Sequence, residues 1–411
     1  MEAITQSNKL YVNSMGTSLI NKTINALVFV LLVYEGWYIE KFGAIPYLLQ
    51  VLAALLTGFT ILRAIPRFTG KIKLISPATG WFFFGLIAVF VAITKSYALV
   101  ALDALFTYFC FWAVCVCIGI ACKQNSSLIR MSILAVLLLC VMSAIFDGYA
   151  YKNGPYYGIT MGPNNNPNTL GSVMTIGVYY IINPQRKVTH LSWALRILGA
   201  VVCLVVVVRT GSRSGLLCYA TVIALTIFFQ FLAYGKTQKS KTTKRILITL
   251  MLVLASIMLA DYMKNVGNGT TGIHRLLNKF NIDAFSGRTN LYVEAWEFFK
   301  QKPVFGIGYR SFEHLSKFDY FTHSTYMELL SCTGVVGFVL FLYPFVRALA
   351  EAWRYRKIDM GRSFTILMIF IAKGFFGIVY YNLVFMVVLY VEIMRARTLE
   401  TGGENDKVMR A

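Results

Sequence analysis

Residues 261–326 of the chain read DYMKNVGNGTTGIHRLLNKFNIDAFSGRTNLYVEAWEFFKQKPVFGIGYRSFEHLSKFDYFTHSTY. This stretch is the one long segment that is not a run of apolar residues, and strongly apolar segments lie on both sides of it. It is basic, rich in aromatic residues and interrupted by glycine, and it contains three of the four histidines, His274, His314 and His323. We therefore interpret the apolar remainder of the chain as a scaffold that positions this stretch.

The composition excludes an ordinary soluble globular protein, because 57% of the residues are hydrophobic and only 14% are charged. A membrane-spanning helix needs roughly 20 apolar residues, and runs of this kind recur along the chain. The predicted fold class is an all-α integral membrane protein, a polytopic bundle of about 12 transmembrane helices with one large extracytoplasmic loop that contains amphipathic helices. The predicted spans lie near residues 23–40, 44–62, 77–94, 97–121, 129–147, 168–183, 192–208, 215–234, 246–262, 324–346, 363–379 and 381–394.

These spans divide the chain into four parts. Residues 1–262 hold transmembrane helices 1–9, residues 263–323 form the large loop with the catalytic residues, residues 324–395 hold transmembrane helices 10–12, and residues 396–411 form a cytoplasmic tail. The run from Ser363 to Met394 is long for one helix and short for two. Its expected break falls at Gly374, Gly377 and Asn382, which are residue types that end or begin helices.

The net charge of +21 has two explanations, a nucleic-acid partner or the excess of Lys and Arg that membrane proteins carry in their cytoplasmic loops. The basic residues concentrate in alternate short loops, which places both termini in the cytoplasm and the large loop outside. The basic run at 235–245 lacks the interleaved aromatic residues on which bases stack. We therefore expect the lipid bilayer, and no nucleic acid, as a partner.

Two arginines on the outer side break this charge pattern. Arg209 and Arg213 lie in the turn RTGSRSG between the seventh and eighth spans, where each cationic side chain costs on the order of a few kcal/mol on insertion scales. Beside glycines and the hydroxyl of Ser212 they suggest an anion site, because glycine lets the backbone approach a phosphate and the following helix presents its N-terminus. The alternative is that the two side chains extend to lipid headgroups.

The loop at 151–171, YKNGPYYGITMGPNNNPNTLG, is also predicted to lie outside. Its asparagines, among them Asn164 and Asn168, offer paired hydrogen-bond donors and acceptors, and its tyrosines offer flat faces. This combination suits the binding of a sugar. The alternative is that Asn168 and Thr169 only cap the helix that follows.

Residues 286–303, SGRTNLYVEAWEFFKQKP, predict an amphipathic helix that lies on the membrane surface or dips into it. Ser286 is placed to cap its N-terminus. The apolar face is predicted to consist of Leu291, Ala295, Trp296, Phe298 and Phe299. Arg288 falls in the first turn, where the helix dipole disfavours a cation. A phosphate bound at this N-terminus is the functional interpretation of Arg288, and an ion pair with Asp283 is the alternative.

The segment GIGYRS follows at 306–311, and it does not fit a dinucleotide-binding motif, since no strand precedes it. Gly306 and Gly308 are expected to form a tight turn that returns the chain to the membrane. Arg310 and His314 are expected to face water, and Arg310 is also a candidate contact to the substrate.

His323 comes immediately before the tenth predicted span, in the sequence THSTYMELL. A histidine at a membrane boundary is often only an interfacial or capping residue, but here an extracytoplasmic cleft would meet the bilayer. A pKa near neutrality suits an imidazole to proton transfer. Glu328, an acid within an apolar run, is expected either to orient His323 or to bind substrate.

Together the candidates are two or three arginines and one histidine, with no paired carboxylates and no cluster of metal ligands. This set argues against a Ser/His/Asp hydrolase, a zinc peptidase and a retaining glycosidase. It fits a transfer reaction with a diphosphate leaving group. In such a reaction arginines neutralise the departing pyrophosphate, and a general base takes a proton from an acceptor hydroxyl.

Four motifs in this order resemble the O-antigen ligase/polymerase superfamily of bacterial envelope polysaccharide enzymes. They are TGSRSG at 210–215, SGR at 286–288, P-x-x-G-x-G-x-x-x-F from 303 and H-x-x-x-x-E-L-L-x-x-x-G-x-x-G from 323, within the stretch from Asn164 to Phe341. The resemblance implies a metal-independent, inverting glycosyl transfer without a cofactor. It further implies an oligosaccharide on undecaprenyl diphosphate as the donor, and a multi-pass enzyme of the bacterial cytoplasmic (inner) membrane whose active site faces the periplasm or the cell exterior.

By this resemblance Arg213 and Arg288 contact the diphosphate, and His323 is the base or orients the acceptor hydroxyl. The chain has Ser324 after the histidine, where the family more often has asparagine, and this departure bears on the local substrate contacts. The candidate substrate-binding residues are Arg209, Arg310, Asn164, Asn168, Ser212 and Glu328.

The motifs do not separate two activities of the superfamily. A polymerase transfers the growing glycan to a sugar hydroxyl of another lipid-linked repeat unit, and a ligase transfers it to lipid A-core. We favour the polymerase, because such chains are more numerous in the superfamily, and the ligase is the alternative. A chain-length regulator or a flippase is a candidate protein partner.

A lipid-linked sugar flippase or transporter is a further alternative from another class of protein. Such a protein should line its interior with charge along several helices. Ionisable residues inside the predicted spans are few, namely Glu35, Asp103, Glu328 and Lys373. The polar chemistry concentrates on one face instead, which favours an enzyme.

Overall fold

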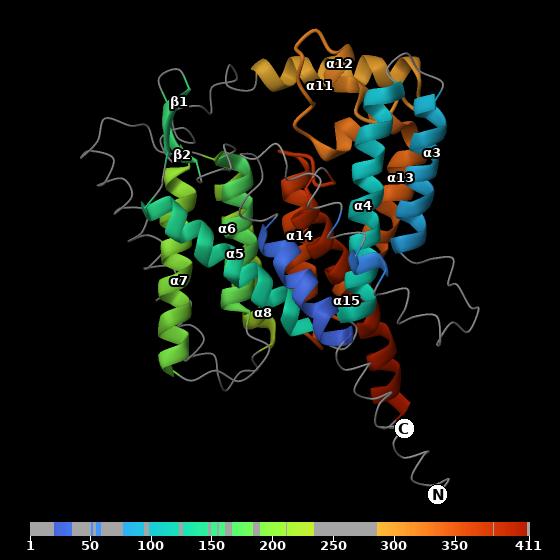
Figure 1. The fold of residues 1–411 in the computed structure, drawn as a ribbon. Coiled ribbons are helices and arrows are strands. Elements are labelled where there is room, and N and C mark those ends of the chain that lie inside the picture. Colours follow the sequence, from blue (N-terminus) through green and yellow to red (C-terminus); the bar gives the residue numbers. More distant parts are fainter. Residues whose placement is uncertain are drawn as a thin grey trace, which may run out of the picture.

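The computed structural model describes residues 20–34, 51, 55–58, 77–93, 98–122, 126–146, 149–153, 156–160, 167–183, 190–210, 212–233, 286–380 and 382–408. Within these residues the chain forms a bundle of helices with one short β-hairpin (Figure 1). The predicted span at 246–262, residues 263–285 of the predicted loop and Asn164 lie outside the described residues, as does most of the predicted span at 44–62.

The long helices agree with the predicted spans to within a few residues at most of their ends. They are the helix Ile20–Tyr34, α3 (Pro77–Ile93), α4 (Ala98–Cys122), α5 (Ser126–Phe146), α6 (Pro167–Ile182), α7 (His190–Arg209), α8 (Arg213–Ala233), α13 (Thr325–Arg354), α14 (Arg362–Gly374) and α15 (Leu383–Val408). Within the described residues one helix, α13, is long and apolar enough to cross a membrane, and six other helices contribute apolar stretches of 10–17 residues. The predicted number of spans therefore stays a prediction.

Two further helices, α11 (Ser286–Gln301) and the short α12 (Ser311–Leu315), do not run along the bundle. They lie across one of its ends, above α3, α4 and α13 (Figure 1). We call this the α11 end of the bundle and the opposite one the far end. Since successive helices run in opposite directions, α6, α8, α13 and α15 begin at the α11 end and α14 finishes there (Figure 1).

A β-hairpin at the α11 end departs from the all-α prediction. β1 (Tyr149–Asn153) pairs antiparallel with β2 (Tyr156–Thr160), so that Tyr149 lies opposite Thr160. The local sequence explains the strands, because Tyr, Ile and Thr favour strands and the Gly-Pro pair between them suits a turn. The prediction is thus right for the bundle and incomplete for this loop.

At the centre of the bundle, α13 packs against α3, α14 and α15. Trp81 of α3 stacks on Phe341 of α13 with ring centroids 5.3 Å apart, and its Nε1 donates a hydrogen bond of 3.1 Å to the Phe341 carbonyl. The hydroxyl of Tyr108 in α4 donates to the Trp81 carbonyl at 2.9 Å. The polar atoms of both buried side chains have partners, so their burial leaves no hydrogen bond unmade.

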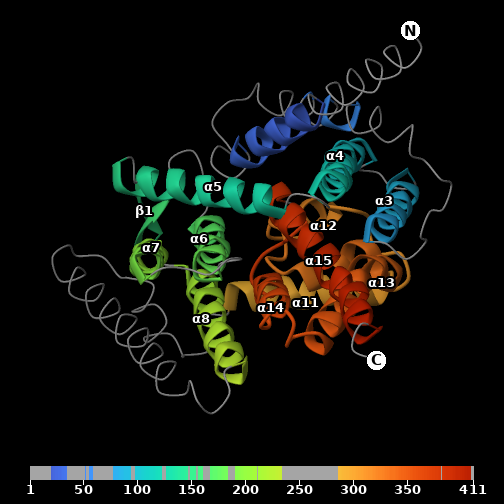
Figure 2. The same cartoon turned by 90° about the horizontal axis from the view of Figure 1, so that it is seen from below.

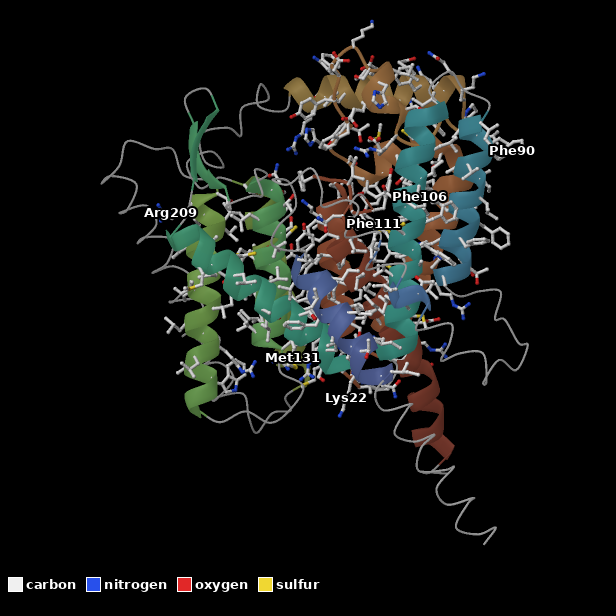
Figure 3. The ribbon with its side chains drawn as sticks, in the orientation of Figure 1. Lys22, Phe90, Phe106, Phe111, Met131 and Arg209 are labelled. Atoms are coloured by element: carbon white, nitrogen blue, oxygen red, sulfur yellow. The ribbon has the colours of Figure 1, made fainter. Side chains whose placement is uncertain are left out.

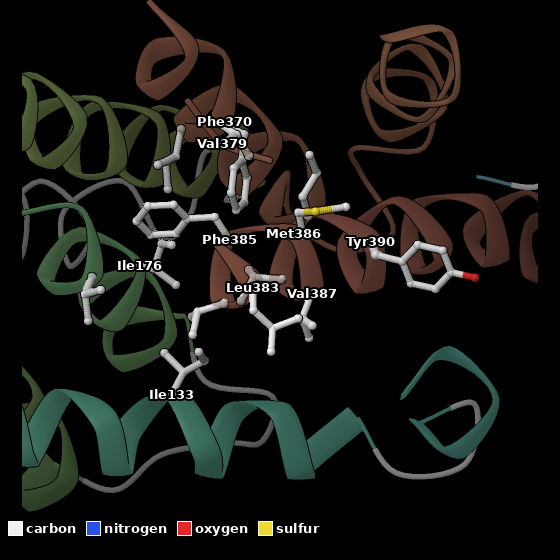
Figure 4. Close-up of a cluster of buried hydrophobic side chains, with 14 of the residues drawn as sticks. Ile133, Ile176, Phe370, Val379, Leu383, Phe385, Met386, Val387 and Tyr390 are labelled. Carbon is white, nitrogen blue, oxygen red and sulfur yellow. The ribbon is translucent and has the colours of Figure 1, made fainter. Parts of the chain in front are cut away.

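A second apolar contact joins α14 and α15 to α5 and α6 (Figure 4). The buried side chains at this contact include Ile133, Ile176, Phe370, Leu383 and Val387. In a bilayer such contacts stabilise a bundle through close packing rather than through removal of apolar surface from water. Good complementarity between these side chains is therefore what holds α14 and α15 in place.

The outward faces of the helices are apolar as well. Phe90 of α3 and Phe106 of α4 are 66% and 54% exposed, whereas Phe111 is 7% exposed and lies within the bundle (Figure 3). Large apolar side chains exposed on this scale are unusual on a soluble protein. They fit the bilayer environment that the sequence predicts.

α13 is broken at Gly334, whose backbone has φ 63° and ψ −169°. The loop at 303–308 fills the break and pairs with the backbone groups around it. Ile307 N–H donates to the Ser331 carbonyl and Gly308 N–H to the Cys332 carbonyl, both at 2.9 Å. Val335 N–H donates to the Pro303 carbonyl at 2.9 Å, and Val336 N–H donates to the Val304 carbonyl at 3.2 Å. The tight turn predicted at Gly306 and Gly308 is confirmed, since both have a positive φ and the turn returns the chain to α13.

Replacement of Gly334 by alanine should destabilise the protein strongly. The residue has a φ of 63°, and an added Cβ would lie 2.3 Å from the carbonyl oxygen of Val304. Backbone strain and this clash together are expected to cost roughly 2–4 kcal/mol, measured as a lower thermal-unfolding midpoint. The control is Gly199→Ala, because its Cβ would meet Ile181 Cδ1 at an ordinary 3.4 Å. Equal midpoints for the Gly334 variant and the wild type would show that the break does not need glycine.

The break predicted at Gly374, Gly377 and Asn382 between the last two helices is confirmed. Asn382 caps α15, because its Oδ1 accepts a hydrogen bond of 3.2 Å from Phe385 N–H. α14 has 13 residues, which is about 20 Å and less than the roughly 30 Å of a bilayer core. The predicted span therefore needs the irregular backbone at 375–380 as well as α14, and such backbone is found at membrane depth only where protein or a cavity covers it.

The last helix is longer than the sequence predicts. α15 continues to Val408, so the residues predicted as a cytoplasmic tail at 396–411 continue the helix as far as that residue. The prediction ended the helix where the apolar run ended. The following residues, RARTLE, are good helix formers on the whole, and they carry the helix onward without apolar character.

Candidate active site

α11 begins where the sequence predicts it and rests on α13 by a narrow apolar stripe. Leu291 and Ala295 are buried in this stripe against Phe312 of α12, and Phe298 packs edge-on to Phe312 with ring centroids 5.8 Å apart. Trp296 is 46% exposed, so it lies outside the stripe that packs against the bundle. At about 100° per residue, Trp296 lies roughly 140° around the helix from Leu291. The stripe fixes the rotation of α11 about its own axis.

Arg288 lies in the first turn of α11, at the end of the helix that extends over α14 and toward α8 (Figures 1 and 2). One turn further along, the hydroxyl of Tyr292 donates a hydrogen bond of 3.1 Å to the carbonyl of Phe375, just after α14. Burial lowers the pKa of Arg288, and Tyr292 partly offsets this effect. The guanidinium stays charged, because arginine is not deprotonated in proteins. α11 therefore holds a half-buried cation beside the end of α14.

His323 lies in a short segment with a left-handed backbone, at φ 57°. On one side of it, Thr322 N–H donates to Glu328 Oε2 at 3.0 Å. Thr322 Oγ1 donates to the Ser324 carbonyl at 2.9 Å, across the histidine. A left-handed non-glycine residue is uncommon, and its surroundings must maintain it, which happens most often at functional sites. Glu328 thereby holds the backbone next to His323, and the two roles predicted for it, to orient His323 or to bind substrate, stay predictions.

The same segment is joined to the end of α14. Ser324 Oγ donates to the Gly374 carbonyl at 3.3 Å, and Thr325 Oγ1 donates to the Gly377 carbonyl at 2.8 Å. Ser324 is the residue at which the chain departs from the superfamily pattern, and these contacts give it a structural role. His323 and the last turn of α14 are fixed relative to each other.

Lys373, in the last turn of α14, completes the group. It is 5% exposed, its Nζ lies 3.5 Å from the Asn168 carbonyl, and its charge acts on both His323 and Arg288. We call Arg288, His323 and Lys373 the cationic site. Within the described parts of the chain, no carboxylate forms an ion pair with any of the three. The helix dipole favours a cation at the C-terminus of α14, but buried positive charge in excess is costly unless an anion joins it.

The surroundings of His323 lower its pKa to about 4. Burial is the largest cause, and the charges of Arg288 and Lys373 add to it. The imidazole packs against Phe321, with ring centroids 4.3 Å apart. His323 is therefore neutral at pH 7, and an anion bound between the two cations would oppose their effect and raise this pKa.

The turn before α8 is joined to the same end of α14. Ser212 caps α8 by accepting a hydrogen bond of 3.0 Å from Gly215 N–H, and its hydroxyl donates to Asn168 Oδ1 at 2.8 Å. The carbonyl of Asn168 is the one that Lys373 contacts. Arg213 is the first residue of α8, and its side chain lies outside the described part of the structure. The turn that carries Arg213 is thus held against the end of α14 that carries Lys373.

Ser212 and Asn168 have positioning roles in this geometry. Ser212 is 2% exposed, and Asn168 Oδ1 also accepts from Ser214 Oγ at 3.3 Å. Asn168 lies inside the first turn of α6, so it links α6 to α8 rather than capping α6. Their roles as substrate contacts stay predictions.

Arg209 and Arg310 are not among the charges that act on His323. Arg209 is exposed at the end of α7, across the bundle from α3 (Figure 3). Arg310 is exposed and pairs with Glu313 at 3.6 Å, in line with the expectation that it faces water. The exposed His314 agrees with the same expectation.

Lys373 is the residue that the predicted site omits. A lysine within an apolar span is a functional candidate by default, and it lies next to the predicted helix break, so the signal was present. The sequence did not reveal what surrounds Lys373. Its neighbours in space come from α6, α11 and the segment before α13, which are distant in the chain.

The described residues offer positive charge and a neutral imidazole, and no three His, Cys, Asp or Glu side chains among them come close enough to hold a metal ion. A buried cluster of cations at the end of a bundle of apolar helices is typical of a functional site in a membrane-integral protein. Residues 198–342 match the family model described as O-Antigen ligase. The match supports the resemblance that the motifs indicate, to the O-antigen ligase/polymerase superfamily, whose members are bacterial membrane proteins. No curated protein matches the chain.

Proposed function

We propose that the protein is a bacterial envelope polysaccharide polymerase, which transfers a glycan from undecaprenyl diphosphate to a sugar hydroxyl of another lipid-linked repeat unit. The observation that carries the proposal is the cationic site, where Arg288 and Lys373 lie beside the neutral His323. The diphosphate of the donor supplies the negative charge that suits the two cations. The acceptor hydroxyl supplies the proton that suits the base.

In the proposed reaction the oxygen of the acceptor hydroxyl attacks the anomeric carbon of the donor glycan. The new glycosidic C–O bond forms as the bond between the anomeric carbon and the diphosphate oxygen breaks, and the diphosphate leaves with the bonding electrons. Arg288 and Lys373, with Arg213, stabilise the charge that grows on the leaving group. His323 accepts the hydroxyl proton. A single displacement of this kind inverts the anomeric configuration.

Binding of the donor also prepares the base. Arg288 and Lys373 help to keep the pKa of His323 near 4. The negative charge of a bound diphosphate opposes both cations and raises this pKa toward the range in which an imidazole is an effective base. His323 thus becomes effective when the donor is in place, which suppresses deprotonation of hydroxyls before the donor arrives.

We place this reaction at the periplasmic or external face of a multi-pass protein of about twelve spans in the cytoplasmic membrane. One support is the distribution of Lys and Arg over alternate loops, which assigns the large loop to the outside. Another is that α11, which belongs to this loop, lies across the end of the bundle that holds the cationic site (Figure 1).

The O-antigen ligase reaction, transfer of the same glycan to lipid A-core, is the second candidate. The description of the matching family model favours it. The two reactions share the donor and the displacement step, so the cationic site serves both. They differ in the acceptor.

An assay of the purified, reconstituted protein with lipid diphosphate-linked repeat units separates these candidates. Lengthening of the glycan without any other acceptor supports the polymerase. Transfer that occurs only when lipid A-core is added supports the ligase. Movement of the lipid-linked sugar across the vesicle membrane without any new glycosidic bond would indicate a flippase or transporter and would exclude both transferases.

Lys373→Met is expected to lower transfer by roughly 10²-fold, since one cation that stabilises the leaving group is lost. The change also removes a positive charge that acts on His323, so the pKa of His323 should rise. The acid limb of kcat/KM should accordingly move to higher pH, a shift that loss of packing alone does not produce. Lys300→Met is the control, because Lys300 is exposed on α11 and pairs with Glu297. If the acid limb of kcat/KM does not move, the charge of Lys373 does not act on His323.

A further inference from the structure

Four arginines gather at the far end of the bundle, opposite the cationic site. They are Arg130 of α5, Arg196 of α7, Arg362 at the start of α14 and Arg395 of α15. Their charges act on one another, Arg130 with Arg196, Arg130 with Arg362, and Arg362 with Arg395. The carboxylates that act on them are Asp359 and Glu392. We call the four arginines the far-end cluster, and its positive charge exceeds the negative charge around it.

Two members of the far-end cluster have protein partners. Arg395 pairs with Glu392 at 3.6 Å, and the hydroxyl of Tyr180 donates to Glu392 Oε1 at 2.9 Å. Arg196 donates from Nη1 to the Ile181 carbonyl. These contacts join α15 to α6 and α7 to α6, and they explain Arg395 and Arg196 as structural residues.

Arg130 and Arg362 have no such explanation. Both are half-buried, and within the described residues neither forms a hydrogen bond or an ion pair through its guanidinium group. Asp359, whose charge acts on Arg362, caps α14 instead, since its Oδ2 accepts a hydrogen bond of 2.9 Å from Ser363 N–H. Two guanidinium groups that repel each other and lack an acceptor suit a phosphate, which accepts several hydrogen bonds from arginine.

Exposed apolar side chains continue outward from the far-end cluster. Met131, next to Arg130, is 60% exposed, and Leu138, two turns further along the same face of α5, is 62% exposed. Leu195, next to Arg196, is 60% exposed. Met131 lies toward the far end of the bundle in Figure 3. The cations near the start of α5 suit the anionic headgroup of a phospholipid, and the apolar face beyond them suits its acyl chains.

We propose that Arg130 and Arg362 bind the headgroup phosphate of an anionic phospholipid whose acyl chains lie along α5. Inorganic phosphate offers the same chemistry to the two guanidinium groups, but it does not cover Met131 and Leu138. The bound lipid fastens α5 to the start of α14, whose other end carries Lys373. The proposal rests on membrane insertion and not on the reaction proposed above.

The test compares the wild type with Arg130→Gln/Arg362→Gln in a neutral detergent. Native mass spectrometry counts phospholipid that remains bound, and thermal unfolding follows the addition of phosphatidylglycerol, phosphatidylcholine or inorganic phosphate. We expect the wild type to retain phosphatidylglycerol and to be stabilised by it, and not by phosphatidylcholine. The double variant should bind phosphatidylglycerol roughly ten- to thirtyfold more weakly.

Arg354→Gln is the matched control, since Arg354 is exposed at the same end of the bundle, in the last turn of α13. It should retain the lipid as the wild type does. Equal retention by the double variant, or stabilisation of the wild type by inorganic phosphate alone, overturns the proposal. If the double variant does not fold, the measurements on the wild type still test the proposal. Equal binding of phosphatidylglycerol and phosphatidylcholine by the wild type overturns the proposal as well.

Discussion

Replacing Arg288 with alanine is expected to lower glycan transfer by roughly 10²–10³-fold while leaving membrane insertion unchanged. Arg288 projects from the first turn of α11, a position that the helix dipole makes unfavourable for a cation. It is half-buried, and within the described residues no carboxylate pairs with it. Its removal should therefore cost the fold little and the transition state much, because the leaving diphosphate loses a preorganised donor.

The measurement is transfer from a lipid diphosphate-linked repeat unit, with the amount of inserted protein determined in parallel. Lys300→Ala serves as the control, since Lys300 lies on the same helix, is exposed and pairs with Glu297 at 2.7 Å. It should retain near-normal transfer. Arg288→Lys should recover part of the activity, because lysine restores the charge without the bidentate geometry. Near-normal turnover by Arg288→Ala would remove this residue from the mechanism.

His323→Ala should have an equal or larger effect, with transfer lower by roughly 10²–10⁴-fold. The histidine is the proposed base of the cationic site, and hydrogen bonds that Thr322 donates to Glu328 and to the Ser324 carbonyl hold its backbone in the left-handed conformation. Since alanine at a positive φ adds strain, His323→Asn is a second variant to assay, because asparagine tolerates this conformation better. His314→Ala is the control, as His314 is exposed in the same part of the chain.

The pH dependence gives a further test of His323. Its pKa in the free protein is lowered to about 4, so kcat/KM should stay high down to that region before it falls. A bound diphosphate raises the pKa, so the acid limb of kcat should lie at higher pH than that of kcat/KM. In the free protein the lowered pKa means that the folded state favours neutral His323. The contribution of His323 to stability is therefore complete above about pH 6.5 and is lost as the pH falls toward 4. Coincident acid limbs would count against the link between the donor and the base.

Helix placement followed from the sequence, because it depends on local properties. Apolar runs, basic loops and the residue types at Gly374, Gly377 and Asn382 are all properties of neighbouring residues, and the helices α3 to α8 and the break after α14 appear where these predict them. The amphipathic helix α11 also follows, although Trp296 is exposed and does not pack against the bundle. The β-hairpin was missed because strand signals in a short turn-rich loop are weak.

Only part of the candidate site could be predicted from the local sequence. Motif order pointed to Arg288 and His323, and unusual positions for cations supported the choice. The left-handed backbone of His323 and the capping role of Ser212 depend on contacts to residues far along the chain. Lys373 could likewise be assigned to the site only from its contacts with residues far along the chain. The place of the Arg213 side chain stays a prediction.

The amino-acid sequence by itself determined that this chain is rich in apolar helices and that its motifs resemble the O-antigen ligase/polymerase superfamily, a resemblance that the family match at residues 198–342 supports. Helix formation and insertion are governed by apolar runs and flanking charge, which are local and can be read along the chain. The tertiary structure decided which cations meet. Arg288 and Lys373 come from helices that meet only in the folded bundle. The pKa of His323 depends on both of them and on burial, so the surroundings of this proposed base are a property of packing.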